Sequence, residues 1–205
     1  MPSARSRKTP ANQLRIIGGR WRSREIHFPD ADALRPTPDR VRETLFNWLG
    51  QSLDGLSVLD LFAGSGALAF EALSRGAAWA VAVDSDAAAV ASLRENAARL
   101  GATDLETHRS DAVAYLAHET RQFDVVFADP PFREPWLARL WSLLPARIAI
   151  GGWLYLEQGA VIDVPDGWEL YRHRKAGQVH YHLLRRAVTA TDANDGAGID
   201  MTRQG

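Results

Sequence analysis

The chain has 205 residues, which suits one domain of ordinary size. Hydrophobic residues make up 46% and charged residues 24%, a globular balance that excludes wholesale disorder. No run of about 18 apolar residues occurs, so no membrane-spanning helix is expected. The basic N-terminus lacks an apolar core, so a secretory signal is not expected either. The absence of cysteine excludes disulfides, thiolate metal sites and cysteine nucleophiles, and fits a reducing, cytoplasmic setting.

Charge is distributed unevenly along the chain. The net charge is only −1, yet residues 1–24 hold seven of the 24 basic side chains and none of the 25 acids, which leaves −8 on the remainder. Such an asymmetry predicts a polyanion-binding arm on an acidic body. Residues 1–13 show no periodicity and are predicted to form a flexible part of this arm.

Residues 14–28 are predicted to form a β-hairpin, because Gly18-Gly19 supplies the positive φ of a tight turn. Three arginines would then share one face of its second strand, namely Arg20, Arg22 and Arg24. The alternative is that the hairpin only covers apolar surface of the main domain, through Ile16, Ile26 and Phe28. A proline-rich linker follows and completes an extension over residues 14–38.

Residues 39–50 are predicted to form a helix with an apolar stripe and with Asp39 as its N-cap. From residue 57, short apolar strands alternate with helices. The expected strands cover residues 57–62, 80–83, 105–108, 123–128 and 153–156. The expected helices cover residues 67–75, 87–100, 112–118 and 137–144, and the second of them is capped by Asp86 and ended by Gly101. This alternation predicts a doubly wound parallel sheet with right-handed crossovers.

The alternation stops before the C-terminus. Residues 168–174 and 178–186 are predicted to form two strands, joined through Ala176-Gly177 into a hairpin at the sheet edge. Residues 187–205 are small, polar and glycine-rich, which predicts a disordered tail. The main domain is therefore expected to span residues 39–186.

A candidate ligand loop, Asp60-Leu-Phe-Ala-Gly-Ser-Gly66, stands where a strand turns into a helix. Glycines there let the backbone approach a ligand beneath the positive helix N-terminus. Asp84 ends the next strand, where an acid can accept hydrogen bonds from both hydroxyls of a ribose. The pattern predicts a nucleoside-containing ligand, but Gly64, Gly66 and Ala69 also satisfy the loose dinucleotide motif.

Asp60 favours one class of ligand. Its carboxylate would repel a pyrophosphate, whereas it would tolerate the ammonium and sulfonium groups of S-adenosylmethionine. The expected cofactor contacts are Asp60, Phe62, Ala63, Gly64, Gly66 and Asp84. Asp111, after the third strand, either lies near the adenine of this ligand or caps the helix that follows.

A second motif, Asp129-Pro-Pro-Phe132, ends the fourth strand. Its prolines stiffen the backbone and leave carbonyls that point outward. A carboxylate and a backbone carbonyl that accept both N–H bonds of an exocyclic base amine favour its pyramidal, attacking form, and Phe132 can stack on the base. Asp129, Pro130 and Phe132 are therefore predicted to be catalytic through orientation and transition-state binding, without a covalent step.

Taken in order, these motifs resemble those of a class I S-adenosylmethionine-dependent methyltransferase of the amino-methylating type. Over about residues 14 to 186, the chain is similar to the bacterial 16S ribosomal RNA (guanine-N2)-methyltransferases. That family carries L-R-I-I-G-G, found here from Leu14, and R-P-T-x-D-x-V-R-E-x-L-F-N-x-L, found here from Arg35. It also carries the loop at Asp60, the DPPF motif and the segment A-G-Q-V at Ala176. The block from Arg35 is the most specific, since DPPF also occurs in adenine-N6 enzymes.

The resemblance implies a Rossmann-like α/β fold, with a seven-stranded, mostly parallel sheet whose last strand is antiparallel, plus a small N-terminal β-hairpin. It implies that the chain methylates N2 of a guanine in 16S ribosomal RNA, with S-adenosylmethionine as the methyl donor. We expect the acceptor to be a small-subunit particle. We expect the enzyme to be a monomer that does not bind membranes. The expected RNA-binding residues are Arg15, Arg20, Arg22, Arg24, Arg35, Thr37, Arg40 and Arg42. Arg40 and Arg42 would equally suit a solvated helix face.

Three other functions stay open at this point: an adenine-N6 methyltransferase on DNA or RNA, an RNA-binding module with a vestigial nucleotide site, and a dehydrogenase. The intact acids Asp60, Asp84 and Asp129 argue against the binding module, and a dehydrogenase leaves DPPF unexplained. His180 and His182 would share a strand face but lack a nearby carboxylate motif, so no metal site is expected.

Overall fold

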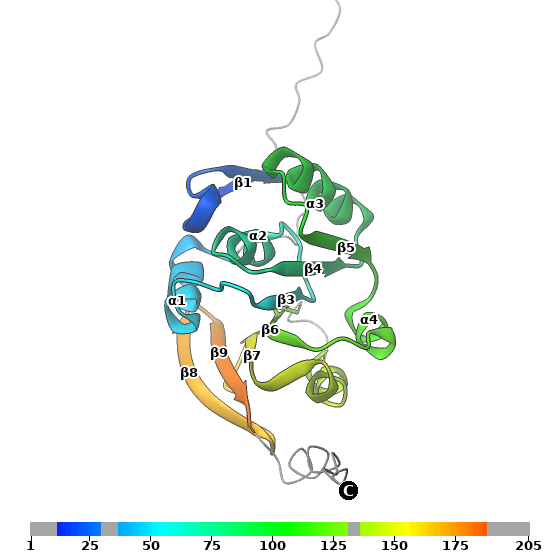
Figure 1. Ribbon diagram of the computed structural model, residues 1–205. Coiled ribbons are helices and arrows are strands. Elements are labelled where there is room, and N and C mark those ends of the chain that lie inside the picture. The colour runs from blue at the N-terminus through cyan, green and yellow to red at the C-terminus, as the bar shows by residue number, and fades with distance from the viewer. Residues whose placement is uncertain (1–11, 30–36, 131–135, 188–205) are drawn as a thin grey trace, which may run out of the picture.

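A computed structural model describes residues 12–29, 37–130 and 136–187. Its centre is a seven-stranded sheet with the strand order β5-β4-β3-β6-β7-β9-β8 (Figure 1). The strands are β3 (Ser57–Asp60), β4 (Trp79–Asp84), β5 (Leu105–Arg109), β6 (Phe123–Ala128), β7 (Ile148–Gln158), β8 (Trp168–Ala176) and β9 (Val179–Arg186). Within this sheet, β9 runs antiparallel to both of its neighbours, and the other pairings are parallel. The predicted fold class is therefore confirmed.

Helices cover both faces of the sheet, as the β/α alternation requires. One face carries α1 (Asp39–Leu49), α2 (Ala67–Ser74) and α3 (Ala87–Leu100), and these share one apolar core. The opposite face carries α4 (Ala112–His118) and α5 (Trp136–Trp141), which pack on a second core. In the described part of the chain, no helix combines the length and apolarity that a membrane span requires.

Local capping signals were mostly correct. The carboxylate of Asp86 accepts hydrogen bonds from the N–H groups of Ala88 and Ala89, and Gly101 ends α3 with φ +68°. Asp39 is not the N-cap of α1, because Pro38 holds that position and its carbonyl accepts the first helical hydrogen bonds. The Asp39 carboxylate instead accepts a 2.6 Å hydrogen bond from Arg42.

The N-terminal extension is an antiparallel hairpin, as predicted, but its turn differs from the prediction. Its two strands, β1 (Asn12–Arg15) and β2 (Glu25–Phe28), are antiparallel, but a 3-10 turn at Gly19–Trp21 separates them. Arg20 lies in that turn, and Arg22 and Arg24 lie in the loop after it. The expectation that these arginines share a strand face is therefore wrong.

The packing of the extension on α2 explains this difference. A Cβ atom on Gly19 would lie 1.8 Å from the carbonyl oxygen of Ser74, so the glycine pair permits close contact with the end of α2 rather than a two-residue turn. The backbone N–H of Trp21 donates to the hydroxyl of Ser74 over 2.9 Å. The apolar side chains of the extension are buried in the main domain, namely Ile16, Trp21, Ile26 and Phe28. The extension thus covers apolar surface, as the alternative stated.

Glu71 on α2 is fully buried, and its carboxylate binds the backbone of the extension. Its carboxylate accepts 2.8 Å hydrogen bonds from the backbone N–H groups of Ile17 and Gly18. It also pairs with the Arg75 side chain at 2.8 Å and with Arg42 at 3.5 Å. Arg42 is fully buried and donates to the carbonyl of Arg15, so the expectation of a solvated helix face is wrong for Arg42. The charged centre therefore ties α1, α2 and the extension together.

We expect Gly19→Ala to lower the free energy of unfolding by at least about 2 kcal/mol, because the new methyl group overlaps a backbone carbonyl and the φ of +73° disfavours a side chain. Gly55→Ala is the matched control, since Gly55 has φ +77° and nothing within 4 Å of the added Cβ atom. Denaturant unfolding of both variants measures the difference. Equal losses would show that Gly19 matters only through its backbone angle.

Candidate active site

Four acidic side chains gather where neighbouring parallel strands end, at the carboxyl edge of the sheet. Asp60 ends β3, Asp84 ends β4, Asp129 follows β6 and Glu157 lies near the end of β7. The strand register pairs Asp60 with Phe127 and Ala128 with Leu156, which places the ends of β3, β6 and β7 side by side. This edge is where open α/β sheets bind their ligands.

The loop after β3 is tied to the end of β4. The N–H of Gly64 donates to one oxygen of Asp84, and the N–H of Asp86 donates to the other, both over 2.8 Å. Each carboxylate oxygen accepts more than one hydrogen bond, so Asp84 keeps capacity for ribose hydroxyls. Gly66 has φ +80°, and a Cβ atom there would meet Leu93 at 2.5 Å. Gly64 and Gly66 thus allow a tight loop, which the hydrogen bond from Gly64 to Asp84 fixes at the end of β4.

Asp60 is buried behind this loop. Its pKa is raised to about 7, mainly by burial and also by the charge of Asp84, while backbone hydrogen bonds from Ala69 and Phe62 lower the pKa. No lysine or arginine among the described residues forms an ion pair with Asp60, Asp84, Asp129 or Glu157. A buried carboxylate without a cation fits the cationic end of S-adenosylmethionine.

Glu157 was missed by the sequence reasoning. It is buried beside Asp129, and the hydroxyl of Tyr155 donates to it over 2.6 Å. Burial, and then the charges of Glu157 and Asp60, hold the pKa of Asp129 well above its usual range. Burial also raises the pKa of Glu157, and the Tyr155 hydrogen bond partly offsets this. An acid after an apolar strand was the signal used for Asp60 and Asp84, and the segment Leu-Tyr-Leu-Glu157 carries the same signal.

The other predicted cofactor and catalytic residues lie close to this edge. Phe62 packs edge-on against Trp136, with ring centroids 5.3 Å apart, and Ala63 donates its N–H to Val83. Pro130 is buried directly after Asp129. Asp111 caps α4 through hydrogen bonds from Val113 and Ala114, so the capping alternative is confirmed. Phe132 and Arg35 lie outside the described residues.

The predicted RNA-binding residues separate into two places. Arg15 and Thr37 line one hollow of about 510 Å³, together with Glu25 and Asp39. Arg20 forms an ion pair with Asp104 at 3.4 Å, and Arg24 donates to the carbonyl of Arg99. Asp104 comes just before β5 and Arg99 lies at the end of α3. Arg20 and Arg24 thus lie at the amino edge of the sheet, opposite the acidic site, with Arg22 in the same loop.

The remaining predicted contact lies on α1, and the histidines for which no metal site was expected lie on the last strands. Arg40 is exposed on α1. His173 and His182 stack with ring centroids 4.6 Å apart, and His173 and His180 lie within hydrogen-bond distance at 3.0 Å. Burial lowers the pKa of His182 to about 4, so this ring is neutral at pH 7.

Comparison with known proteins identifies the family of this chain. Residues 14–185 match the family model described as Conserved hypothetical protein 95. The chain is 44% identical over 185 residues to ribosomal RNA small subunit methyltransferase D of Escherichia coli K12, which covers 86% of this chain and 91% of the relative. The chain belongs to this methyltransferase family. The Haemophilus influenzae protein of the same name is 36% identical, with 84% and 94% covered.

Solved structures agree with membership of the methyltransferase D family. The Escherichia coli methyltransferase yhhF has a TM-score of 0.79 at 43% identity and covers 87% of this chain and 100% of its own. The Thermus thermophilus 16S rRNA N2 G1207 methyltransferase RsmC has a TM-score of 0.65 at 24% identity, covers 87% of this chain and 50% of its own, and shows the fold alone. The predicted enzyme class and the dependence on S-adenosylmethionine are thus confirmed.

Proposed function

We propose that this enzyme transfers the methyl group of S-adenosylmethionine to the exocyclic N2 of a guanine in 16S ribosomal RNA. We further propose that it acts as a monomer on a small-subunit particle. The observation that carries the proposal is the pair Asp129 and Glu157 at the carboxyl edge, next to the loop that Asp84 holds.

The two carboxylates favour guanine over adenine. Guanine presents neighbouring N1–H and N2–H donors on its pairing edge, and these donors stabilise the ionised forms of two acids whose pKa burial raises. An ionised carboxylate only accepts hydrogen bonds. Asp129 would accept from N2 and Glu157 from N1. Adenine presents an acceptor, N1, beside its amine, and this lone pair would face a carboxylate oxygen. A site with two neighbouring acids therefore suits guanine N2 better than adenine N6.

The residues of this chain act on the charge that develops during transfer. When bound, S-adenosylmethionine supplies an activated methyl group on a sulfonium ion. As the guanine amine attacks, positive charge builds up on N2, and the Asp129 carboxylate beside it stabilises that charge and accepts the released proton. The Pro130 backbone adds a rigid carbonyl acceptor. Asp84 would hold the ribose of the cofactor, and Asp60 would hold its cationic end.

We expect the affinity for S-adenosylmethionine to rise with pH up to about 7. Below that pH Asp60 is protonated, because burial raises its pKa to about 7, and a cationic ligand must displace this proton. The same shift lowers the stability of the ligand-free protein as pH rises from about 4 to 7, since the unfolded chain holds fewer protons there. Calorimetry in buffers of different ionisation heat would detect the released proton. A pH-independent affinity, equal to that of Asp60→Asn, would remove Asp60 from the site.

The proposed function is tested by transfer of a labelled methyl group. The purified protein is incubated with labelled S-adenosylmethionine and either free 16S ribosomal RNA or small-subunit particles that lack the modification. Label in the RNA of the particle is the expected result. Label in free RNA alone would overturn the particle as acceptor, and no label in either would contradict the proposed function.

A further inference from the structure

The terminal hairpin, formed by β8 and β9, carries an excess of positive charge. Between residues 168 and 186 there is one acid, Glu169, and there are five bases, although the whole chain has a net charge of −1. The bases are Arg172, Arg174, Lys175, Arg185 and Arg186. The terminal hairpin therefore stands out from a body that is otherwise acidic.

The tip of the terminal hairpin lies at the same edge of the sheet as the acidic site. Tyr181 of β9 pairs with Glu157 of β7 on one side and with Arg174 of β8 on the other. Because neighbouring strands are about 4.8 Å apart, the backbones of Arg174 and Glu157 are separated by about 10 Å. Directly paired residues point to the same face, so Arg174 lies on the sheet face that carries Glu157.

Aromatic rings continue this face along β8. The rings of Trp153 and Tyr171 lie 5.0 Å apart, and Tyr171 is 42% exposed. The guanidinium groups of Arg172 and Arg185 lie over these rings, at 4.0 Å from Tyr171 and 5.6 Å from Trp153. Aromatic rings beside arginines are the combination that binds single-stranded RNA, because bases stack on the rings and phosphates pair with the cations.

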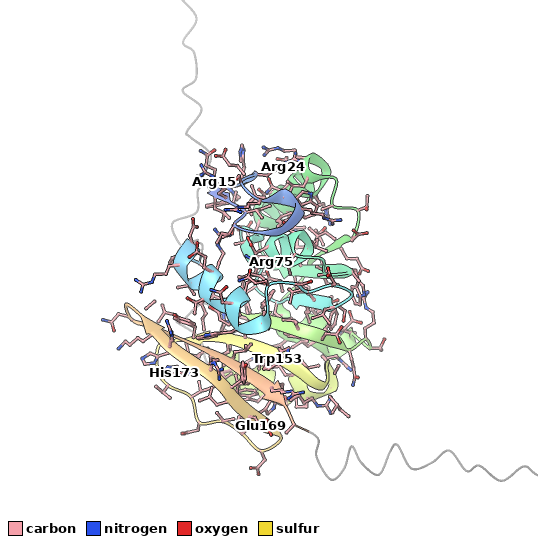
Figure 2. The ribbon with its side chains drawn as sticks, turned by 60° about the vertical axis from the view of Figure 1, so that its left-hand side comes forward. Arg15, Arg24, Arg75, Trp153, Glu169 and His173 are labelled. Atoms are coloured by element: carbon pink, nitrogen blue, oxygen red, sulfur yellow. The ribbon has the colours of Figure 1, made fainter. Side chains whose placement is uncertain are left out.

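Three bases of the terminal hairpin form fewer ion pairs than the bases of the N-terminal extension. Arg172, Arg174 and Lys175 are exposed and form no ion pair with an acid among the described residues. In the extension, Arg15 pairs with Glu25 and Arg20 with Asp104. Figure 2 shows Arg15 and Arg24 at one end of the molecule and Trp153, Glu169 and His173 toward the other.

We propose that the terminal hairpin binds the RNA strand that carries the target base, through Arg172, Arg174 and Lys175 and the rings of Trp153 and Tyr171. The inference rests on the proposed function, because it takes RNA as the substrate. The arginines of the extension, at the amino edge, then lie away from the strand that carries the target base. The hairpin sets the affinity for the segment that enters the active site.

Two charge-matched triple variants test this inference. The variant Arg172→Gln/Arg174→Gln/Lys175→Gln and the control Arg20→Gln/Arg22→Gln/Arg24→Gln each remove three positive charges. Three lost phosphate contacts lower the salt slope of RNA binding by about two, and the affinity for 16S ribosomal RNA at least about 10-fold at 0.1 M salt. We expect the hairpin variant, but not the control, to show both losses and a raised KM for RNA, with kcat and the affinity for S-adenosylmethionine unchanged. A folded hairpin variant with the wild-type slope and KM would overturn the inference.

A second measurement keeps the inference testable if the hairpin variant fails to fold. The natural chain has no cysteine, so single Arg174→Cys and Arg22→Cys variants accept an iron chelate at one position each. Radicals from residue 174 should cleave the RNA beside the methylated nucleotide, and radicals from residue 22 should cleave elsewhere. The reverse pattern contradicts the inference. If the wild-type protein transfers no methyl group to the RNA, the proposed function itself is wrong.

The alternative role of the basic side chains on β8 is to keep molecules apart, because charges on an edge strand prevent strands of two molecules from pairing. If this is their use, the hairpin variant will associate with itself while its RNA binding stays normal. Light scattering at several protein concentrations measures that association. Such a result would contradict RNA binding by the terminal hairpin.

Discussion

Asp129→Ala is expected to lower kcat by about 10²–10³-fold, the usual loss when one group that stabilises transition-state charge is removed. Asp129 follows β6 at the carboxyl edge, and Glu157 and Asp60 are the charged neighbours that raise its pKa. Its proposed partner is the base amine, so the positive charge that develops on N2 would lose its nearest carboxylate. The KM for RNA should change little, and the affinity for S-adenosylmethionine should stay nearly intact.

Asp84→Ala is the matched comparison for Asp129→Ala, because both variants remove one carboxylate from the same edge. Its expected effect is on the cofactor, whose affinity should fall by about 1.5–3 kcal/mol, the range for hydrogen bonds to a charged group. Calorimetry and steady-state kinetics on both variants separate the two roles. The assignment of Asp129 fails if Asp129→Ala keeps near-normal turnover or loses cofactor affinity instead.

Glu71→Ala should have the largest effect on stability, about 3–5 kcal/mol, the usual cost of removing one partner from a buried ion pair. The side chain of Glu71 has no exposed surface, and that of Arg75 is only 7% exposed. The variant would leave two buried guanidinium groups, on Arg42 and Arg75, without this carboxylate. It would also leave the backbone N–H groups of Ile17 and Gly18 without their acceptor. Denaturant unfolding measures the loss.

An exposed ion pair gives the control for Glu71. Glu106 pairs with Arg121 at 3.0 Å, and their side chains are 49% and 38% exposed. Glu106→Gln should therefore cost less than about 1 kcal/mol. Glu71→Gln keeps the volume and one acceptor, so its loss should fall between the two. If Glu71→Ala unfolds as the wild-type protein does, the charged centre does not hold the extension.

The core of the fold could be predicted because its signals are local. Apolar runs such as Phe123–Ala128 predict buried parallel strands. Asp86 and Gly101 mark the ends of α3 through contacts within a few residues. The acids at the ends of the strands could be read in the same way, since parallel strands bring their carboxyl ends to one edge. The same rule also applies to β7, which ends near Glu157, although the sequence analysis did not apply it to that strand.

The turn of the extension could not be predicted because its conformation depends on distant partners. Gly18-Gly19 suits a two-residue turn in isolation. In the structure, however, the N–H of Gly18 donates to the Glu71 carboxylate, and the carbonyl of Gly18 accepts a hydrogen bond from the Ser74 hydroxyl. The sequence pattern likewise suits an exposed position for Arg42, but in the structure its side chain is buried and forms an ion pair with Glu71. In both cases a buried polar group more than twenty residues away outweighs the local preference.

The most direct test of the central claim is the identity of the methylated nucleoside. RNA labelled by the wild-type protein is digested to nucleosides, and these are separated and compared with standards. Since the resemblance and the paired acids Asp129 and Glu157 both indicate guanine, the label should co-migrate with N2-methylguanosine. Label in N6-methyladenosine would contradict the account, and would assign the site to the amine of adenine instead.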